Sequence, residues 1–525
     1  MAAHSNGAQY DVIVVGGGPG GSTTAALIAK RNNHRVLLLE KEKFPRYQIG
    51  ESLLPFTIHG IGGMLGLRDE FAKHGFIKKT GGSFLWGKNP EPWRFDFDGS
   101  PLLRELDSNF AFHVERDKFD KLLLDNARKL GAEVREQSTV KDAIIEDGRV
   151  VGVRYTDVDG HDHEVRARFV VDASGNTGTL HRHAGTRVYS EFFQNVALFT
   201  YFRGAKRLPE PHTGNFYGAA FEGGWFWFIP LSDTLTSVGA VVSKEHVDAI
   251  QKAPEKAFNE LIDRCPSIKA MLEGSERITE GLHGQFRVRK DYSYSNTKIT
   301  MPGLYLVGDA GCFIDPVLST GVHLATYAGM LAARSINTSL DDPTISEERC
   351  QEEYESRYMS EFGRLYSVLI VFYDLNRDED SYFWSASAAL NTEHEQQTGF
   401  VELLGGFGDP EAFFHGAWSV SDKVKERMNR KGKAFRMFFF APFDENEVEE
   451  AMVGKQDLSV PGPVGVMRRA VLGQPEEVPE RDGGMMTTED FLAWREPSLE
   501  ALEKARLAKP KEASRQYTEL LTVEE

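Results

Sequence analysis

The residues with the clearest chemical potential stand in a glycine-rich turn near the N-terminus. A β-branched run, Tyr10–Val15, leads into the turn, and an alanine-rich stretch, Ser22–Lys30, follows it. This order predicts a strand, a tight turn and a helix whose N-terminal N–H groups face a phosphate. Gly16 would permit the turn, Gly18 the approach of a pyrophosphate, and Gly21 close packing of the helix on the strand. We assign five glycines of this turn to the binding of a cofactor that carries a pyrophosphate: Gly16, Gly17, Gly18, Gly20 and Gly21.

A second predicted strand completes a dinucleotide-binding unit. It runs from Arg35 to Leu39 and ends in Glu40, an acidic residue at the position expected to bind a ribose hydroxyl. A glycine turn alone would be weak evidence. The complete unit predicts an α/β fold with a Rossmann-type dinucleotide-binding domain.

Trp225 and Trp227 are one residue apart, so on an extended strand they would lie on the same face. For an isolated strand, two core aromatics are the more common explanation. The pattern Trp-x-Trp-x-Ile-Pro, which ends in Ile229 and Pro230, resembles the signature of the flavin-dependent halogenases. These enzymes share their fold and flavin chemistry with aromatic monooxygenases.

Three more segments resemble motifs of the flavoprotein hydroxylase superfamily: 304–310, 114–120 and 170–175. The resemblance implies that the dinucleotide is FAD, that Asp309 binds its ribityl chain, and that Arg116 contributes to its binding. The other residues assigned to the cofactor by resemblance are Arg46, Glu51, Ser52 and Val322. A second GxGxxG after a strand is absent from the sequence. We therefore expect one dinucleotide, supplied as reduced FAD (FADH2) by a separate flavin reductase.

Lys78 and Lys79 form an adjacent pair, and alternation along a strand would send one inward and the other outward. The resemblance identifies Lys79 as the inward, catalytic lysine. It implies that reduced FAD, dioxygen and chloride yield hypochlorous acid, which Lys79 guides to an aromatic carbon. A lysine can do this as an ammonium that donates a hydrogen bond or as an amine that forms a chloramine. Burial would favour the neutral amine, and the sequence leaves both forms open.

A halide site is expected in the segment 315–323, which leads into a helix. Backbone N–H groups at a helix start attract anions without a full positive charge. By resemblance, Thr320 and Gly321 contact chloride, or bromide, and Val322 touches the flavin. A plain N-cap by Ser319 or Thr320 would give the same pattern, and one helix start can serve both purposes.

One difference from the tryptophan halogenases bears on the identity of the substrate. Leu318 stands where tryptophan halogenases place a glutamate, so free tryptophan is not the expected substrate. Longer segments resemble the phenol- and carrier-acting branch: 44–55, 193–198, 230–242 and 380–386. This likeness implies chlorination of a tyrosyl-like phenol held on a peptidyl carrier protein, in natural-product biosynthesis. A basic run, 423–436, could dock an acidic carrier, although a solvated helix face is the commoner meaning of such a run.

Other functions stay open at this point. A free phenol or a carrier-bound pyrrole could replace the tethered phenol as substrate. An aromatic hydroxylase or a prenyl reductase on the same fold is the second hypothesis, and a non-catalytic flavoprotein that binds a partner is the third. Lys79 together with the two tryptophans favours the halogenase.

Composition limits the remaining classes. The chain has 525 residues and a formal net charge of −17, which argues against nucleic acid as a partner. Its three cysteines, Cys265, Cys312 and Cys350, show no spacing typical of a zinc site or a disulfide framework. No metal is therefore expected. The sequence also lacks a signal peptide or an apolar run long enough for a membrane span, so we expect a cytoplasmic enzyme.

The motifs divide the chain into three parts. Residues 1–190 and 285–345 are expected to form the FAD-binding domain, because both carry its motifs. Residues 191–284 alternate in short β-like runs and should form an inserted β-sheet module over the flavin. Residues 346–525 should form a mainly helical C-terminal region.

Overall fold

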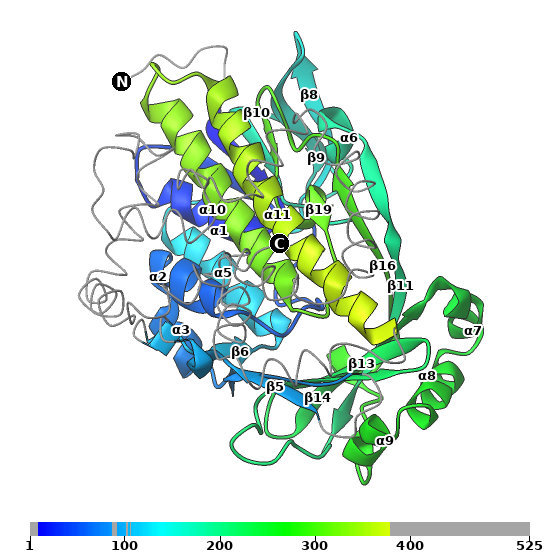
Figure 1. Cartoon of the computed structure of the whole chain (residues 1–525). Helices are drawn as coiled ribbons and strands as arrows, with labels where there is room; N and C mark the ends of the chain where they lie inside the picture. The colour runs from blue at the N-terminus through cyan, green and yellow to red at the C-terminus, as the bar shows by residue number, and fades with distance from the viewer. Residues whose placement is uncertain (1–8, 87–91, 101–102, 105–106, 378–525) are drawn as a thin grey trace, which may run out of the picture.

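The computed structural model describes residues 9–86, 92–100, 103–104 and 107–377. Two large β-sheets and a group of long helices make up this part of the chain (Figure 1). The basic run 423–436 and the segment 380–386 lie outside the described residues.

The first sheet carries the predicted dinucleotide unit. Its strands follow the order β17 (Thr300–Met301), β18 (Leu304–Leu306), β10 (Asp162–Asp172), β1 (Tyr10–Val15), β2 (Val36–Leu39) and β7 (Glu133–Arg135). From β18 to β7 all neighbours are parallel, which suits the continuous apolar runs of β1 and β2, because a parallel sheet is covered on both faces. A hairpin of β8 (Thr139–Glu146) and β9 (Arg149–Thr156) extends antiparallel from β10.

Four helices pack together against this sheet (Figure 1). They are α1 (Pro19–Ala29), α5 (Arg116–Lys129), α10 (Thr320–Asp341) and α11 (Glu347–Arg377). Every residue of α1 is buried, and its small side chains let α10 approach closely. A Cβ on Gly329 of α10 would stand only 2.6 Å from the carbonyl oxygen of Gly20. The expectation of a helical segment from about residue 346 agrees with α11, although residues beyond 377 are not described.

The second sheet carries the tryptophan motif. Its order is β19 (Cys312–Phe313), β16 (Arg287–Asn296), β11 (Arg187–Arg203), β14 (Leu235–Ser243), β13 (Gly224–Pro230), β12 (Phe216–Phe221), β4 (Gly81–Leu85) and β5 (Trp93–Asp96), with β15 (Glu276–Arg277) beside β11. Strands of this sheet therefore come from all three of the ranges 1–190, 191–284 and 285–345. The parallel pair of β4 with β12, far apart in sequence, is the contact that a linear division of the chain does not reveal.

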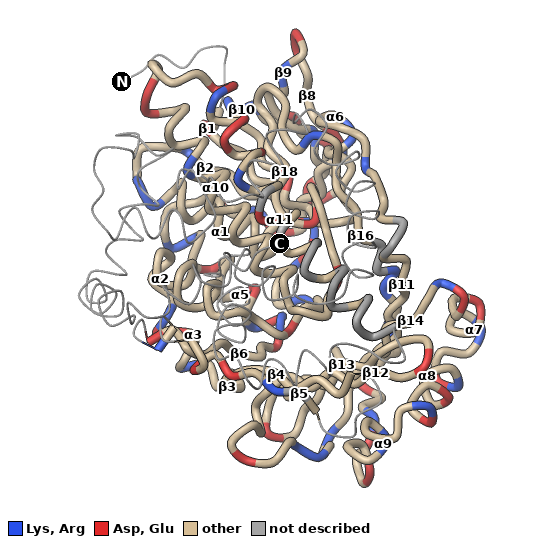
Figure 2. The backbone as a smooth tube through the Cα atoms, in the orientation of Figure 1, with Lys and Arg blue, Asp and Glu red and all other residues tan. Residues whose placement is uncertain are grey.

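Strand β13 divides its side chains between two cores. Trp225, Trp227 and Ile229 join the large core that continues into the first sheet. Phe226 and Phe228 point the other way, into a smaller core with Phe258 of helix α8 (Pro254–Asp263). Period-two alternation thus gives every side chain of this uncharged strand an apolar environment. Figure 2 shows charges of both signs on the peripheral helices α7 (Val247–Lys252), α8 (Pro254–Asp263) and α9 (Pro266–Leu272).

Smaller elements complete the described fold. Strands β3 (Ile77–Lys79) and β6 (Ala111–His113) form a separate antiparallel pair. The short helices are α2 (Gly62–Met64), α3 (Arg68–Lys73) and α6 (His181–Ala184), and single helical turns occur at Thr57–Ile61, Phe97–Gly99, Lys244–His246, Gly281–His283 and Gly308–Ala310. Cys265, Cys312 and Cys350 are buried free thiols. None of the helices in the described ranges is long and apolar enough to cross a membrane.

Gly21 offers a test of the close packing at the glycine turn. A Cβ there would lie 2.0 Å from the carbonyl oxygen of Gly16. In an open helix, Gly→Ala stabilises by about 1 kcal/mol, whereas overpacking costs about 1–3 kcal/mol. Gly21→Ala should therefore lower Tm in thermal unfolding, while the control Gly99→Ala, whose Cβ would meet no atom within 4 Å, should leave Tm nearly unchanged. Equal Tm values for the two variants would contradict this packing.

Candidate active site

The glycine turn follows the carboxyl end of β1 and has the geometry of a phosphate cradle. Gly16 adopts a φ of +101°, a conformation that favours glycine. Glu40, at the end of β2, accepts a hydrogen bond from the Gly17 N–H at 2.6 Å. Helix α1 begins at Pro19 with no side-chain cap and no acidic residue in its first turn. Its first N–H groups therefore retain their capacity to bind an anion.

A buried carboxylate holds two arginines beside this turn. Asp120 accepts hydrogen bonds from Arg116 Nε and Nη2 at 2.7 and 2.9 Å, and from Arg46 Nη1 at 2.8 Å. The Nη2 atom of Arg46 lies 3.7 Å from the point where a Cβ on Gly18 would stand. A cation thus sits next to the open backbone of Gly18 and the uncapped start of α1. These residues fit the diphosphate of a dinucleotide such as FAD.

Two further carboxyl groups gather around Arg116. Burial raises the pKa of Asp309 to about 6, while Arg116 and Arg187 act in the opposite direction. Burial also raises the pKa of Glu51 to about 7, against the hydrogen bonds of Tyr201 and Ser237 and the charge of Arg116. Arg116 therefore links the segment that contains Glu51 to the Gly-Asp-Ala turn, although the two are distant in sequence.

The two neighbouring lysines have opposite environments. Lys78 is exposed on β3, with its ammonium over the ring of Phe110, whereas Lys79 is only 3% exposed. Nζ of Lys79 donates to Ser52 Oγ and to the Leu53 carbonyl, each at 3.0 Å. Burial lowers the pKa of Lys79 to about 7. Ser52, which the sequence assigns to the cofactor, is thus also the hydrogen-bond acceptor of this lysine.

The segment before α10 forms the expected helix start. Thr320 is the first residue of the helix and is buried, and Ser319 precedes it in the left-handed conformation. Ser319 makes no side-chain cap, and the first turn holds no acidic residue. The N–H groups at this helix start therefore remain suited to an anion. A Cβ on Gly321 would lie 3.8 Å from the ring of Phe313, an ordinary van der Waals contact, and Val322 is buried at 7% exposure.

The two tryptophans are fixed by polar partners at their indole nitrogens. Trp225 Nε1 donates to the hydroxyl of Tyr373 at 2.7 Å, and Tyr373 donates to Asp315 at 2.9 Å. Trp227 Nε1 donates to Ser237 Oγ at 3.2 Å. These two hydrogen bonds connect Trp225 on β13, through Tyr373 on α11, to the loop that precedes the candidate halide site. Ile229 and Pro230 continue the same strand and are buried.

Trp227 also requires a glycine on the neighbouring strand. Gly239 of β14 lies directly opposite it, and a Cβ there would meet the indole ring at 2.3 Å. The ring is flanked by Phe199, with centroids 5.4 Å apart, while Trp225 stacks at a tilt against Trp86 at 6.0 Å. The motif thus forms a continuous aromatic wall.

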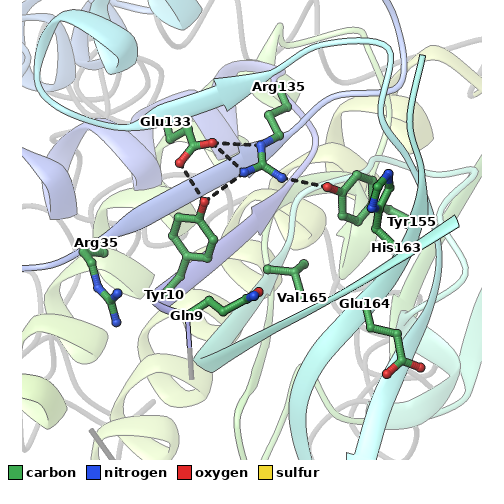
Figure 3. A pocket seen from close by; sticks show the side chains of 9 residues that line it. All are labelled: Gln9, Tyr10, Arg35, Glu133, Arg135, Tyr155, His163, Glu164 and Val165. Atoms are coloured by element: carbon green, nitrogen blue, oxygen red, sulfur yellow. Dashed lines mark hydrogen bonds and ion pairs between the residues drawn. The ribbon is translucent and has the colours of Figure 1, made fainter. Parts of the chain in front are cut away.

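A surface pocket at the opposite end of the first sheet has different chemistry. Figure 3 shows it near the start of β1, whereas the glycine turn follows the end of that strand. Tyr10 donates to Glu133 at 2.6 Å, and Arg135 binds Glu133, Tyr10 and Tyr155. These polar groups satisfy one another, so the pocket is a poor candidate for the reaction.

Comparison with known proteins identifies the family of this chain. A family model described as tryptophan halogenase matches residues 11–105 and 103–431. This chain belongs to that family. Its members include flavin-dependent halogenases, so this chain is a flavin-dependent halogenase and its cofactor is a flavin. Among the hypotheses that the sequence left open, the halogenase is thus confirmed.

Three similar proteins define the relationship further. The tryptophan 2-halogenase of Chondromyces crocatus is 36% identical over 364 residues, 68% of this chain and 67% of that protein. A flavin-dependent halogenase of Penicillium aethiopicum is 36% identical over 333 residues, 58% of this chain and 60% of that protein. The solved structure of the myxobacterial chondrochloren halogenase, an FAD-dependent halogenase, is 55% identical, with a TM-score of 0.69 over 76% of this chain and 90% of that one.

Three supporting residues of the halogenase were not assigned from the sequence: Asp120, Ser237 and Tyr373. Asp120 is four residues after Arg116 on the same helix, so i,i+4 spacing of opposite charges could have indicated the pair. Ser237 and Tyr373 act across 10 and 148 residues of chain. No local pattern marks either of them.

The buried position of Lys79 predicts a pH-dependent stability. Its pKa of about 7 in the folded chain lies below the ~10.4 of an unfolded chain, so between these values the unfolded state binds more protons and stability rises with pH. Lys79→Met removes the cost of burying the amine. The variant's advantage in Tm should be largest near pH 6 and shrink toward pH 10. The exposed control Lys78→Met should show a pH-independent difference, and parallel Tm profiles for both variants would contradict the shift.

Proposed function

We propose that this halogenase is a two-component enzyme that chlorinates a phenolic, tyrosyl-like ring tethered to a peptidyl carrier protein. A separate flavin reductase would deliver reduced FAD. The bound cofactor would supply the electrons with which dioxygen and chloride give hypochlorous acid. The observation that carries the proposal is the buried amine of Lys79, which is hydrogen-bonded to Ser52 in a flavoprotein with the tryptophan motif.

Lys79 would guide the oxidant to the substrate. A pKa of about 7 leaves ammonium and amine at comparable populations near neutral pH. The ammonium would donate a hydrogen bond to hypochlorous acid, and the amine would take up chlorine as a chloramine. Its bonds to Ser52 and Leu53 fix the position of Nζ in either form. Such fixed placement favours attack on one ring carbon.

The aromatic wall would separate this chemistry from competing reactions. Trp225 and Trp227 are 1% and 5% exposed, and their nitrogens are held by Tyr373 and Ser237. We propose that they keep the phenol away from the reduced cofactor, so that the small oxidant crosses to the substrate but the ring does not reach the flavin. At the start of α10, Thr320 and Gly321 would bind chloride or bromide.

The choice of a phenol rests on Leu318 and on the chondrochloren halogenase. Leu318 is buried at 3% exposure and offers no carboxylate at the position where the resemblance to tryptophan halogenases expects one. An indole would lack that assistance, whereas a phenol is already activated toward substitution. The name of the Chondromyces crocatus relative refers to tryptophan, but the chondrochloren halogenase is the more similar protein of the two, at 55% against 36% identity.

The role of Lys79 has a direct test. Lys79→Ala should bind FAD and consume dioxygen, because the cofactor contacts lie elsewhere, but should lose at least about 100-fold in the rate of chlorinated product. Lys78→Ala, which removes the exposed lysine of the pair on β3, should remain within about threefold of wild type. Mass spectrometry of product with parallel oxygen measurement checks both. Chlorination by Lys79→Ala at more than a few per cent of the wild-type rate would refute the assignment.

The tethered substrate requires its own experiment. Wild-type enzyme with a flavin reductase, chloride and dioxygen should chlorinate a tyrosyl thioester on a carrier protein with a kcat/KM at least about tenfold above that for free tyrosine or a simple phenol. Free tryptophan and a carrier-bound pyrrole serve as alternative substrates. Equal values for free and tethered phenol would remove the carrier from the proposal but leave halogenation in place.

A further inference from the structure

Chlorination by this route needs a proton at a buried site. With neutral reduced FAD, the balance is one dioxygen, one chloride, one aromatic C–H and one proton in, and oxidised FAD, one C–Cl bond and two waters out. Four electrons reach dioxygen, two from the flavin and two from the C–H and chloride pair. Chloride enters as an anion and ends in a neutral product, so one proton per turnover must follow it. This step rests on the proposed function.

A chain of hydroxyl groups leads from the flavin site toward the surface. At its inner end, Glu51 is 2% exposed and shares the neighbourhood of Arg116 with Asp309. Its Oε1 accepts a hydrogen bond from the hydroxyl of Tyr201 at 2.7 Å. The hydroxyls of Tyr201 and Tyr47 are in turn 2.8 Å apart. Three groups from different parts of the chain thus form one unbroken hydrogen-bonded line.

The outer end of the line is less buried than its inner end. Tyr47 is half-buried, in contrast to Tyr201, which is fully buried. The guanidinium of Arg287 covers the Tyr47 ring at 3.4 Å, and the ring of His283 lies 4.3 Å from that of Tyr201. These neighbours hold both rings in place, so that the two hydroxyls stay aligned between the carboxyl group and the surface.

We propose that Tyr47, Tyr201 and Glu51 form the path by which a proton enters the flavin site. Glu51 releases its proton to oxygen derived from dioxygen, which leaves as water. Tyr201 then donates its hydroxyl proton to the carboxylate, Tyr47 replaces the proton of Tyr201, and water replaces that of Tyr47. Each hydroxyl breaks one O–H bond and forms another, so neither tyrosine is left ionised. The path acts through Glu51, and the tyrosines are positioning and relay residues.

The charges around the line suit this direction of transfer. Burial raises the pKa of Glu51 to about 7, so the group can both hold and release a proton near neutral pH. Arg116 and Glu115 face it with opposite charges, and Ser237 donates a further hydrogen bond. Burial raises the pKa of both tyrosines, with Glu51 adding to the effect, while Arg287 and Arg289 oppose it at Tyr47. Ionised tyrosinate is therefore disfavoured, which favours concerted transfer between neutral hydroxyls.

The decisive variant is Tyr47→Phe, which removes one hydroxyl and leaves the bond between Tyr201 and Glu51 intact. In FAD-loaded enzyme with 13C-labelled glutamate, a pH jump should shift the infrared carboxyl band of Glu51, identified by its loss in Glu51→Gln. The relaxation should slow at least about tenfold in Tyr47→Phe and in Tyr201→Phe. Tyr201→Phe should also raise the midpoint of the band, because the carboxylate loses a donor. Tyr155→Phe, whose hydroxyl binds Arg135 in the pocket of Figure 3, is the matched control.

The outcomes separate this proposal from the proposed function. Wild-type relaxation rates in folded Tyr47→Phe and Tyr201→Phe overturn the path, whatever the enzyme chlorinates. Slow relaxation in both, together with slower uptake of protons by an indicator dye during a single turnover, supports it. Slow relaxation in the two variants, together with a wild-type enzyme that yields no chlorinated product, would contradict the proposed function and keep the path.

Discussion

The parallel pairing of β1 with β10, and of β10 with β18, is the constraint on which the site depends. In this register Val15 is opposite Asp172, and Asp172 is opposite Leu306, so three strands end at one edge of the sheet. The glycine turn and the Gly-Asp-Ala turn therefore emerge side by side, although nearly 300 residues of chain separate them. A slip of one residue would turn every side chain of a strand to the other face and would misplace both turns.

Burial of charge sets the chemistry that this edge can support. Ionised Lys79 is positive, whereas ionised Glu51 and Asp309 are negative. Burial nevertheless shifts the pKa of each group in the direction that favours its neutral form, because the ionised form loses its contact with water. Groups with pKa values of about 6 to 7 can change protonation state at little cost near neutral pH. Asp120 differs, because two arginines hold it in a network of charged hydrogen bonds. The site thus combines fixed ions that would position the cofactor with groups that can gain or lose a proton near neutral pH.

Much of this arrangement is predictable from local sequence patterns. The glycine turn, the strand that precedes Glu40 and the helix start at Thr320 follow from spacing within a few residues. Alternation predicts only that one of Lys78 and Lys79 points inward, and the family resemblance selects Lys79. The partners that complete the site are not predictable in this way. Tyr373 reaches Trp225 across 148 residues, and Tyr201 reaches Glu51 across 150. Such contacts depend on how the sheets pack, which single residues do not encode.

The difference between local patterns and long-range contacts also explains which strands belong to the second sheet. Strands β4 and β5 lie between motifs of the FAD domain, so their sequence position assigns them to it. Pairing with β12 instead places them at the end of the sheet that carries the tryptophans. Lys79 is followed after one residue by β4, so the strand that leaves the lysine runs directly into the sheet of the motif. The lysine is thereby separated by one residue from a strand of the sheet that carries the aromatic wall.

Trp225 and Trp227 need close packing both as core residues and in the separating role proposed for them. A wall that contains a small oxidant must leave no void, and close packing is what the core already provides. Gly239 makes room for one indole, and Trp86 packs against the other. Each indole N–H is bound to a hydroxyl, so neither ring can rotate without leaving a buried donor unpaired. The rigidity that stabilises this strand is therefore what would allow it to separate the flavin from the substrate.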